Sequence, residues 1–515
     1  MENSYKKFIA CCLGIMLLSL LAAGAVNLVV DPYGVWGLYR QQGFNLWAAR
    51  GEDKERLVKP LQALTVKPQA VFLGNSQPLA ALDTETYERL TGQEAYNYAL
   101  PGASVYEMRR CLEHMLLCSD RLSSVIVAVN FEQFAANPRH PLDRTQPGFD
   151  EAQMDSRHIT GENLAKTLLS LEALRDSRET LRLNRDHPYG TEFLVGGRYA
   201  DVSQDYRNHR LAWQFQTTIT KVLALGDYYE GMCLDEDSFR ELQRILDLCS
   251  AHDLQVQVCI MPMHARAMQM RAPAWDCYEE WLRRLTAMVP VWFFEGYDGL
   301  TESDALPGQV EMETNLYYWD THHPKRQVGD MILTRLCGGE SFGRLLTASD
   351  VDEALALLRA GRRDWEAAHP ESVEEVLYYS GFAPQVPQAL AGEMVPKPGV
   401  VRLDAPPGGQ GLLAELPRSG SLELSGGFLG QAAGPVRIYA VLEDGQGSFY
   451  YALAEPAENR AIAAFMYQQA DAYAGFRLQA PLRRVEPGLY RLSFVEAAAD
   501  GGLTASGPLG TVQVR

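Results

Sequence analysis

Three residues that together could activate a nucleophile stand far apart in the chain. Ser76 ends a Gly-Asn-Ser run, while Asp320 and His323 open and close the run Asp-Thr-His-His. A serine hydroxyl is a weak nucleophile until a base takes its proton, and the base needs a carboxylate that fixes its orientation. We therefore predict that Ser76 is the nucleophile, His323 the general base and Asp320 the residue that orients the base.

His322 offers a second way to pair the aspartate, because an Asp-x-His spacing is also chemically workable. The residues that follow favour one of the two histidines. Pro324 and Gly338 predict a helix over 324–337, since proline favours the first helical position and glycine the position past the last turn. His323 would then lie in the loop that enters this helix, which is a rigid place for a base, and we favour it over His322.

An oxyanion that develops during acyl transfer needs hydrogen-bond donors aimed at it. The backbone N–H of Ser76 is one candidate. Gly102 follows a second apolar run and offers another backbone N–H, and Asn130 follows the run Val-Ile-Val-Ala-Val and offers a side-chain amide. The alternatives are an ordinary turn glycine at position 102 and a strand-end cap at Asn130.

Three further residues are candidates for contact with a substrate. His264 follows the strand predicted at residues 256–261, so it would lie at the carboxyl edge of the sheet, where open α/β folds bind ligands. Tyr318 and His322 flank the predicted catalytic aspartate, and a tyrosine could stack on a sugar ring. The alternatives are a structural histidine at position 264 and an aromatic core residue at position 318.

Apolar runs alternate with segments of helical spacing through the first two thirds of the chain. We predict strands at residues 70–73, 95–100, 125–129, 256–261 and 291–294. We predict helices at residues 78–90, 106–118, 239–249 and 275–288. Strands alternating with helices favour an α/β fold class with three α/β/α layers, in which helices cover both faces of a parallel sheet.

Residues 136–235 interrupt this alternation. They are rich in Arg, Asp, His and Asn, with helical stretches at residues 164–183. We interpret the segment as an insertion that could cap an active site, because long loops in compact domains often act as lids. A solvated structural excursion is the alternative.

The period of the apolar residues changes near the C-terminus. Residues 395–409 are rich in Pro and Gly, and beyond them apolar and polar residues alternate between glycine-rich turns, which predicts a small β-sandwich. A length of 515 residues fits two or three domains. The predicted divisions are residues 1–37 for an N-terminal anchor or signal peptide with an exit turn, 38–345 for the catalytic domain, 346–394 for a helical linker and 395–515 for the β-sandwich.

The N-terminus predicts a membrane location. Lys6 and Lys7 precede an uncharged apolar run over residues 8–30, about the ~20 residues that a membrane helix needs. Lysines before such a run keep that end cytoplasmic, so the rest of the chain should face the periplasm or the cell exterior. A cleaved signal peptide is the alternative, with a small-residue cleavage site at residues 23–25. We favour a retained single-pass anchor, because the apolar run continues past that site.

Composition narrows the function classes. The formal net charge of −18 argues against nucleic-acid binding, because a protein that binds a phosphate backbone needs a basic face. The nine cysteines lack metal-ligand spacing, and most of them are expected to be buried free thiols. The chain has no Walker-type loop, no HExxH motif and no CxxC motif, so we expect no nucleotide, metal or other cofactor.

Taken together, these residues resemble the SGNH, or GDSL-type, hydrolase superfamily. Its four sequence blocks contribute a serine, an oxyanion glycine, an oxyanion asparagine and the histidine of an Asp-x-x-His run. The matching positions are Ser76, Gly102, Asn130 and His323. The third block of the family usually reads Gly-x-Asn-Asp, whereas residues 128–131 here read Ala-Val-Asn-Phe, and Asn75 stands where the first block has aspartate. The resemblance covers residues 68–338.

An apolar N-terminus followed by Asp-Pro-Tyr-Gly, Gly-Asn-Ser and a late Asp-x-x-His run is similar to membrane-anchored bacterial SGNH proteins of polysaccharide modification, such as those of alginate O-acetylation. This resemblance implies an extracytoplasmic O-acetyltransferase or carbohydrate esterase that acts on a cell-surface or exported polysaccharide. It also implies that a multi-spanning membrane acyltransferase supplies the acyl donor. By analogy alone, the β-sandwich would suit carbohydrate or partner binding.

Two other classes of function stay open at this point. One is a non-catalytic glycan-binding or scaffold subunit of a polysaccharide export complex, and the other is a lipase or thioesterase. A serine, an aspartate and a histidine that each occupy a workable position favour an enzyme. Transfer and hydrolysis stay equally open, because the same triad serves both reactions.

Overall fold

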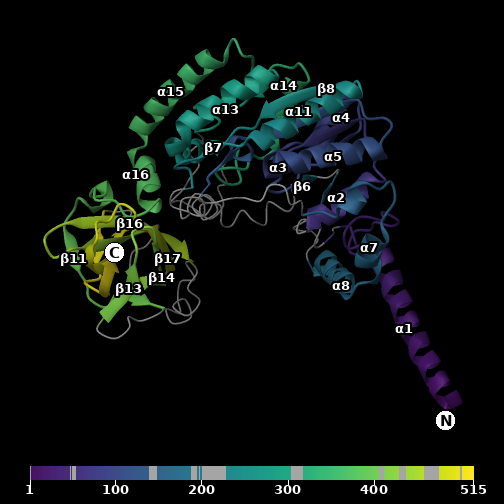
Figure 1. Ribbon diagram of the computed structural model, residues 1–515, viewed down its shortest axis with the longest axis horizontal. Coiled ribbons are helices and arrows are strands. Elements are labelled where there is room, and N and C mark those ends of the chain that lie inside the picture. Colours follow the sequence, from purple (N-terminus) through teal and green to yellow (C-terminus); the bar gives the residue numbers. More distant parts are fainter. Residues whose placement is uncertain are drawn as a thin grey trace.

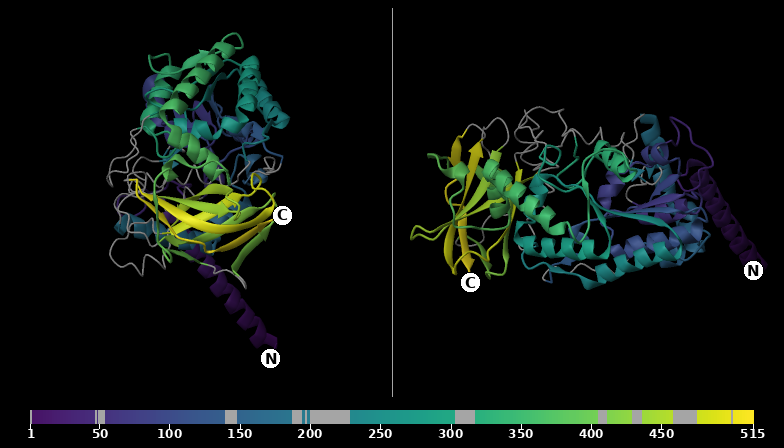
Figure 2. Two further views of the ribbon diagram at one scale, coloured as in Figure 1. Left: turned by 90° about the vertical axis from the view of Figure 1, so that its left-hand side faces the viewer. Right: turned by 90° about the horizontal axis from the view of Figure 1, so that it is seen from above.

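The structure is a computed structural model. It describes residues 2–46, 48, 54–138, 148–186, 194–195, 198–199, 228–302, 317–404, 411–428, 436–457, 475–498 and 501–515. An apolar helix, α1 (Glu2–Val30), projects from one end of the molecule, an α/β unit forms the middle, and a β-rich unit lies at the other end (Figures 1 and 2).

The α/β unit is built on a sheet that has six strands within the described residues. They are β1 (Ala70–Leu73), β2 (Ala95–Asn97), β3 (Ser124–Val129), β8 (Gln255–Ile260), β9 (Val291–Phe293) and β10 (Arg344–Leu346). Their spatial order is β10-β9-β8-β3-β1-β2, and all neighbours are parallel except β10, which pairs antiparallel with β9. The predicted mixed α/β class is confirmed, with an antiparallel edge strand that the sequence pattern did not show.

Helices cover both faces of this sheet, because successive residues of a strand point to opposite sides. In β1, Val71 and Leu73 pack with one set of helices, whereas Ala70 and Phe72 pack with the other. The first set is α5 (Val105–Cys118), α11 (Glu236–Ala251) and α13 (Trp275–Met288). The second set is α3 (Ser76–Ala81), α4 (Thr84–Thr91) and α14 (Arg326–Leu336).

The order β2-β1-β3-β8-β9 places a topological switch point between β1 and β3. The connection from β1 to β2 crosses one face through α3 and α4, and the connection from β3 to β8 crosses the other face through α11. The two connections leave the adjacent strand ends in opposite directions and open a crevice there, which is where open α/β sheets bind ligands. Ser76 follows β1 and Asn130 follows β3, so both lie at this switch point.

Two helix predictions need correction. The helix predicted at residues 78–90 is two helices, because Leu82 leaves the helical conformation and the Asp83 side chain accepts a hydrogen bond from the Glu85 N–H to start α4. The helix predicted to begin at Pro324 begins at Arg326 instead, because Pro324 forms a β-bridge with Tyr318.

The predicted insertion is closed at its base by a short strand pair. β4 (Ala135–Ala136) pairs antiparallel with β7 (Cys233–Leu234), which brings together the two ends of the predicted segment 136–235. Its described part contains α6 (Glu151–Met154), α7 (Gly161–Leu164), a π-helical turn η3 (Ala165–Leu169), α8 (Leu171–Asp186) and the hairpin of β5 (Leu194–Val195) and β6 (Arg198–Tyr199). Residues 139–147, 187–193, 196–197 and 200–227 lie outside the described residues.

α15 (Val351–Ala368) and α16 (Pro370–Tyr379) connect the two larger units. The helical run breaks at His369 because the following proline disfavours the helical conformation there. Glu375 on α16 forms ion pairs with Arg266 of the α/β unit and with Arg437 of the C-terminal unit, at 3.3 Å for the latter. α16 therefore ties the two units together.

The C-terminal unit is a curled sheet of ten strands within the described residues, eight of them on its main path and two, β13 and β20, off it. The strands are β11 (Met394–Pro396), β12 (Val401–Leu403), β13 (Leu412–Leu416), β14 (Ser421–Phe428), β15 (Val436–Glu443), β16 (Phe449–Ala457), β17 (Gly475–Pro481), β18 (Gly488–Ala498), β19 (Leu503–Ala505) and β20 (Gly510–Val514). The predicted period of two is visible in β15, where Ile438 and Ala440 face the enclosed core and Tyr439 and Val441 face the core that contains α16.

The apolar helix α1 is long and apolar enough over Tyr5–Val30 to cross a membrane. Its end is fixed by polar groups. Asp31 has a φ of +49°, and its carboxylate accepts hydrogen bonds from the N–H groups of Val35, Trp36 and Gly37 at 2.9–3.1 Å. The chain therefore leaves the helix through a tight, ordered turn.

Candidate active site

Ser76 occupies a sharp turn between β1 and α3. Gly74 makes this turn possible, because its φ is +155° and a Cβ there would lie 2.5 Å from Cγ of Pro78 and 2.8 Å from the Ala128 carbonyl oxygen. Asn75 caps the helix, with Oδ1 accepting from the Gln77 N–H at 3.0 Å. Ser76 is half-buried between buried neighbours, so its hydroxyl is the one side chain of the turn that reaches the surface.

The predicted acid and base lie on a loop that closes on itself. Tyr318 and Pro324 form a β-bridge, the Trp319 N–H donates to the His323 carbonyl at 2.8 Å, and the Lys325 N–H donates to the Tyr317 carbonyl at 2.7 Å. Inside the loop, Asp320 Oδ1 accepts from the N–H groups of His322 and His323 at 2.7 and 2.9 Å. The aspartate thus fixes the loop backbone as well as the imidazole.

The structure brings Ser76, His323 and Asp320 into one hydrogen-bonded chain. His323 Nδ1 lies 2.7 Å from Asp320 Oδ2, and His323 Nε2 lies 2.8 Å from Ser76 Oγ, although serine and histidine are 247 residues apart. Because a carboxylate only accepts, Nδ1 carries the proton and Nε2 is left to accept the serine proton. This is the arrangement in which histidine can act as a general base.

Electrostatics keep Asp320 ionised. Burial alone would raise the pKa of this carboxyl, but the adjacent His323 imidazole, its hydrogen bond and the His322 N–H hold the pKa well below the ordinary range. The side chains of Asp320 and His323 are 17% and 28% exposed. The site therefore excludes enough water to strengthen the interaction between Asp320 and His323, and it is open enough for a substrate to reach it.

His322 does not pair with Asp320 through its ring. Its Nδ1 lies 3.1 Å from Thr321 Oγ1, and only its backbone N–H contacts the aspartate. Burial lowers the pKa of His322 to about 4, so the ring is neutral at neutral pH. Of the two pairings that the sequence allowed, the structure has the one with His323.

The predicted oxyanion donors lie on the serine turn and on segments next to it. Ser76 is the first residue of α3, so its N–H has no acceptor within the helix. The Leu100 N–H donates to the Gly74 carbonyl at 3.0 Å, which places the turn containing Gly102 beside the serine turn. Gly102 is exposed with a φ of +63°, and no described residue accepts a hydrogen bond from its N–H.

A buried lysine supports the turn that contains Gly102. Lys59 donates from Nζ to the Asn97 carbonyl at 3.1 Å and also to the Ala99 carbonyl. Burial lowers the pKa of Lys59 to about 7, although Glu55 favours the charged form. The sequence pattern did not identify this residue, because a lysine in an amphipathic helix usually faces solvent.

Gln77 is a second residue that the sequence pattern did not identify. Its side chain is buried next to the serine and links two other blocks of the site. Gln77 Nε2 donates to the His322 carbonyl at 3.0 Å, and its Oε1 accepts from Asn130 Nδ2 at 3.4 Å. Asn130 also caps the short helix η2 (Phe131–Gln133), with Oδ1 accepting from the Gln133 N–H. The capping alternative for Asn130 therefore holds, and its amide still faces the serine turn through Gln77.

Two predicted substrate contacts lie inside the protein. His264 is fully buried, and its Nδ1 accepts from the Arg266 N–H at 3.2 Å as the cap of α12 (Ala265–Met270). Tyr318 is fully buried as well, with its ring 5.7 Å from the His264 ring. Neither side chain lines an open surface, so direct contact with a substrate does not fit this structure. Both residues instead pack beneath the Asp320 loop, where the His264 N–H donates to the Thr321 carbonyl.

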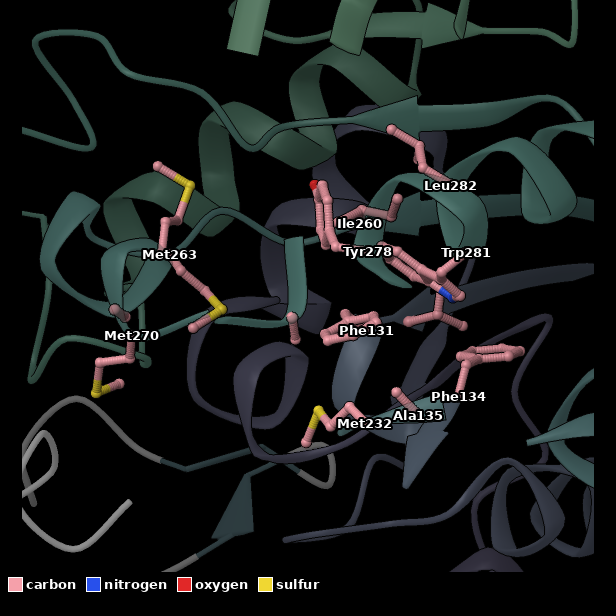
Figure 3. Packing of buried hydrophobic residues seen from close by; sticks show 14 of the residues in the cluster. Phe131, Phe134, Ala135, Met232, Ile260, Met263, Met270, Tyr278, Trp281 and Leu282 are labelled. Carbon is pink, nitrogen blue, oxygen red and sulfur yellow. The ribbon is translucent and has the colours of Figure 1, made fainter. Parts of the chain in front are cut away.

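A buried ion network lies behind the site. Arg271 donates to Glu132 at 2.7 and 2.9 Å and to Glu295 at 2.7 Å, and Glu295 also accepts from the Tyr278 hydroxyl at 2.5 Å. Phe131, next to Asn130, packs edge-on against Tyr278 and Trp281 (Figure 3). The network and these aromatic rings therefore fix the position of Asn130 at the end of β3.

Part of the insertion approaches the serine. The backbone of β6 runs beside α3, the helix that begins at Ser76. The predicted lid at residues 136–235 stays a prediction, because residues 139–147, 187–193, 196–197 and 200–227 of this segment lie outside the described residues.

Comparison with protein-family models, with curated proteins and with solved structures gives no match to this chain. The geometry of the described residues and the resemblance in the motif residues are therefore what bears on function.

Proposed function

We propose that this protein is an extracytoplasmic serine-dependent O-acyltransferase or esterase of the SGNH type that acts on a polysaccharide. The observation that carries this proposal is the hydrogen-bonded chain from Ser76 through His323 to Asp320 at a switch point of the sheet. Helices on both faces of the central sheet, and strand ends that carry Ser76 and Asn130, are consistent with the SGNH assignment.

The reaction would begin with attack of Ser76 Oγ on the carbonyl carbon of an acyl ester. His323 Nε2 takes the hydroxyl proton as the new C–O bond forms, and the ionised Asp320 stabilises the resulting imidazolium. When the tetrahedral intermediate collapses, the bond to the donor alcohol breaks and the imidazolium returns the proton to that alcohol. An acyl-serine and a neutral imidazole remain.

The second half-reaction repeats these steps with an acceptor. A sugar hydroxyl or water loses its proton to His323 and attacks the acyl-serine, and Ser76 recovers its proton as it leaves. The negative oxygen formed in both steps can be met by the N–H groups of Ser76 and Gly102 and by the amide of Asn130. A lid formed by residues 136–235 would favour transfer over hydrolysis by excluding water.

The polysaccharide and acetyl parts of the proposal rest on the resemblance to membrane-anchored SGNH proteins. The proposed extracytoplasmic location rests on α1 together with the two lysines that precede its apolar run. A membrane acyltransferase would supply the acyl group.

The decisive experiment measures acetyl release from p-nitrophenyl acetate by the full chain in detergent micelles, with and without oligosaccharide acceptors. Wild-type protein should release acetyl, and Ser76→Ala and His323→Ala should not. Acetylated oligosaccharide identifies a transferase, whereas free acetate alone identifies an esterase. Equal rates for wild type and both variants would refute the proposal that the protein is an enzyme. The alternative function, a glycan-binding or scaffold subunit, would then be favoured.

A further inference from the structure

The segment Gly161–Leu171 runs beside the last turns of α1 and exposes large apolar side chains. It contains α7, the π-helical turn η3 and the first residue of α8. Leu164, Leu169 and Leu171 are 40%, 41% and 82% exposed. The segment also carries an exposed ion pair, Lys166 with Glu162 at 2.7 Å, so it combines exposed apolar and charged side chains, as segments that lie at a membrane interface do. The three leucines are called the leucine foot below.

The leucine foot is fixed to α1 by specific contacts. Asn27 Nδ2 donates to the Leu168 carbonyl at 2.7 Å, and Ser177 Oγ donates to Asn27 Oδ1 at 2.8 Å. Gly24 allows the close approach, because a Cβ there would lie 3.1 Å from Cδ2 of Leu169. Figure 1 shows α7 and α8 beside the end of α1 that joins the body. The height of the foot along α1 is therefore the level of residues 24–27.

This level coincides with the edge of a lipid bilayer if α1 crosses one. The apolar span Tyr5–Val30 has 26 residues and, at about 1.5 Å per residue, is longer than the ~30 Å hydrocarbon core. Its last turns must then lie at the boundary between acyl chains and headgroups. Val26 and Val29 of α1 are 42% and 52% exposed, so the last turns of α1 also expose apolar side chains at this level.

Polar contacts take over on the side of the foot that faces the body. The Tyr33 hydroxyl donates to Asp176 at 2.8 Å, and Lys54 forms ion pairs with Glu172 at 2.6 Å and with Asp176 at 3.3 Å. Leucines at the level of the last turns of α1, with a layer of ion pairs beyond them, match the change from acyl chains to headgroups and water. This pattern favours lipid over an apolar protein partner.

We propose that the leucine foot inserts into the bilayer leaflet at the C-terminal end of α1 and rests the body of the protein on the membrane surface. With α1 it makes a second point of attachment, so it sets the height and tilt of the α/β unit above the lipid. The proposal goes beyond the reaction assigned to Ser76 and holds for any chemistry at that site.

The test uses the full chain in phosphatidylcholine nanodiscs, with the exposed cysteines at positions 11, 12 and 233 replaced by serine. A polarity-sensitive fluorophore is attached at Leu171→Cys, and the lipid contains a spin-labelled quencher. Leu17→Cys in α1 reports the anchor. Leu357→Cys in α15, far from α1, is the matched exposed leucine. We expect blue-shifted and quenched emission at positions 171 and 17, and unquenched emission as in water at position 357.

Each contrary outcome is distinguishable. Water-like, unquenched emission at position 171 with quenching at position 17 would show that α1 spans the membrane but that the leucine foot does not enter it. The three leucines would then be a binding surface for a protein partner. Unquenched emission at both positions would overturn foot and anchor together. Leu164→Cys repeats the measurement in case the label at position 171 disturbs the start of α8, and it should be quenched as well.

Discussion

The site around Ser76 and the network around Arg271 each pair a cation-forming side chain with at least one carboxylate. They differ in how far these side chains are exposed to solvent and in whether all their hydrogen-bonding groups have partners. The His323 and Asp320 side chains are 28% and 17% exposed, whereas those of Arg271 and Glu295 are each 1% exposed and that of Glu132 is 22% exposed. Arg271 donates to two carboxylates, and both carboxylates also accept from tyrosine hydroxyls. Around Ser76, by contrast, the N–H of Gly102 has no acceptor among the described residues.

This difference separates a group of residues suited to chemistry from one suited to support. A saturated, buried ion pair has no remaining donor for a substrate, and removing one member leaves a charge without a partner in the interior. A partly exposed triad with unused donors can lose its serine hydroxyl at little cost to folding. Substitutions in the first region should therefore reduce activity, and those in the second should reduce stability.

The largest effect is expected for Ser76→Ala. Without the proposed nucleophile no acyl-serine can form, so kcat/KM for p-nitrophenyl acetate should fall by about 10⁴-fold or more. The unfolding transition should stay in place, because a half-buried hydroxyl is all that is lost. Ser349→Ala, at an exposed serine before α15, is the matched control and should change neither quantity. A variant that keeps wild-type activity would remove Ser76 from the chemistry.

Asp320→Asn should cost about 10³- to 10⁴-fold in kcat, because an amide does not hold the imidazole in the tautomer that leaves Nε2 free to accept. The pKa of Asp320 is lowered in the fold, so its carboxylate adds stability that is fully present above the ordinary value of 3.8 and is lost as pH falls below it. The stability gap between wild type and variant should then be constant above about pH 5 and shrink progressively as the pH falls from about 4 to about 2. Urea unfolding across this range measures it, and a constant gap would contradict the assigned pKa direction.

Arg271→Met tests the other side of the comparison. It leaves Glu132 and Glu295 without their cation, which should cost about 3–5 kcal/mol of stability and lower the melting temperature. Thermal unfolding followed by circular dichroism measures this. Arg240→Met, at an exposed ion pair with Asp237, is the control and should change stability by less than about 1 kcal/mol. If Arg271→Met were as stable as the control but inactive, the network would belong to the chemistry.

The sequence predicted the parts of this molecule that depend on local pattern. The strand at 70–73 and the helix at 275–288 have the predicted bounds, because an apolar run and a helical period are local properties. The break at Asp83 was not predicted, although aspartate is a favoured N-cap residue. The helix start predicted at Pro324 was wrong, because Pro324 forms a β-bridge with a residue six positions earlier.

Long-range packing explains what the sequence did not reveal. The burial of His264 beneath the Asp320 loop depends on a neighbour more than fifty residues away, and a Met-Pro-Met-His run contains no sign of it. The Arg271–Glu132 pair joins residues 139 positions apart. The order of serine, aspartate and histidine in the sequence suggested a triad. The residues that hold the triad in place could be identified only from the structure.

Gln77 lies between the two regions of the comparison, and its substitution should have a smaller effect than any of the three above. Gln77→Leu removes the bonds to the His322 carbonyl and to Asn130, so kcat should fall by about 10- to 100-fold with KM nearly unchanged. Gln77→Glu separates the two contacts, because a carboxylate can still accept from Asn130 but has no N–H for the carbonyl. If Gln77→Glu keeps most of the activity, Gln77 acts by holding the Asn130 amide; if it loses as much as Gln77→Leu, the contact with the histidine loop is what counts. Steady-state kinetics of the two variants, with unfolding measured beside them, would assign Gln77 to the chemistry or to the support.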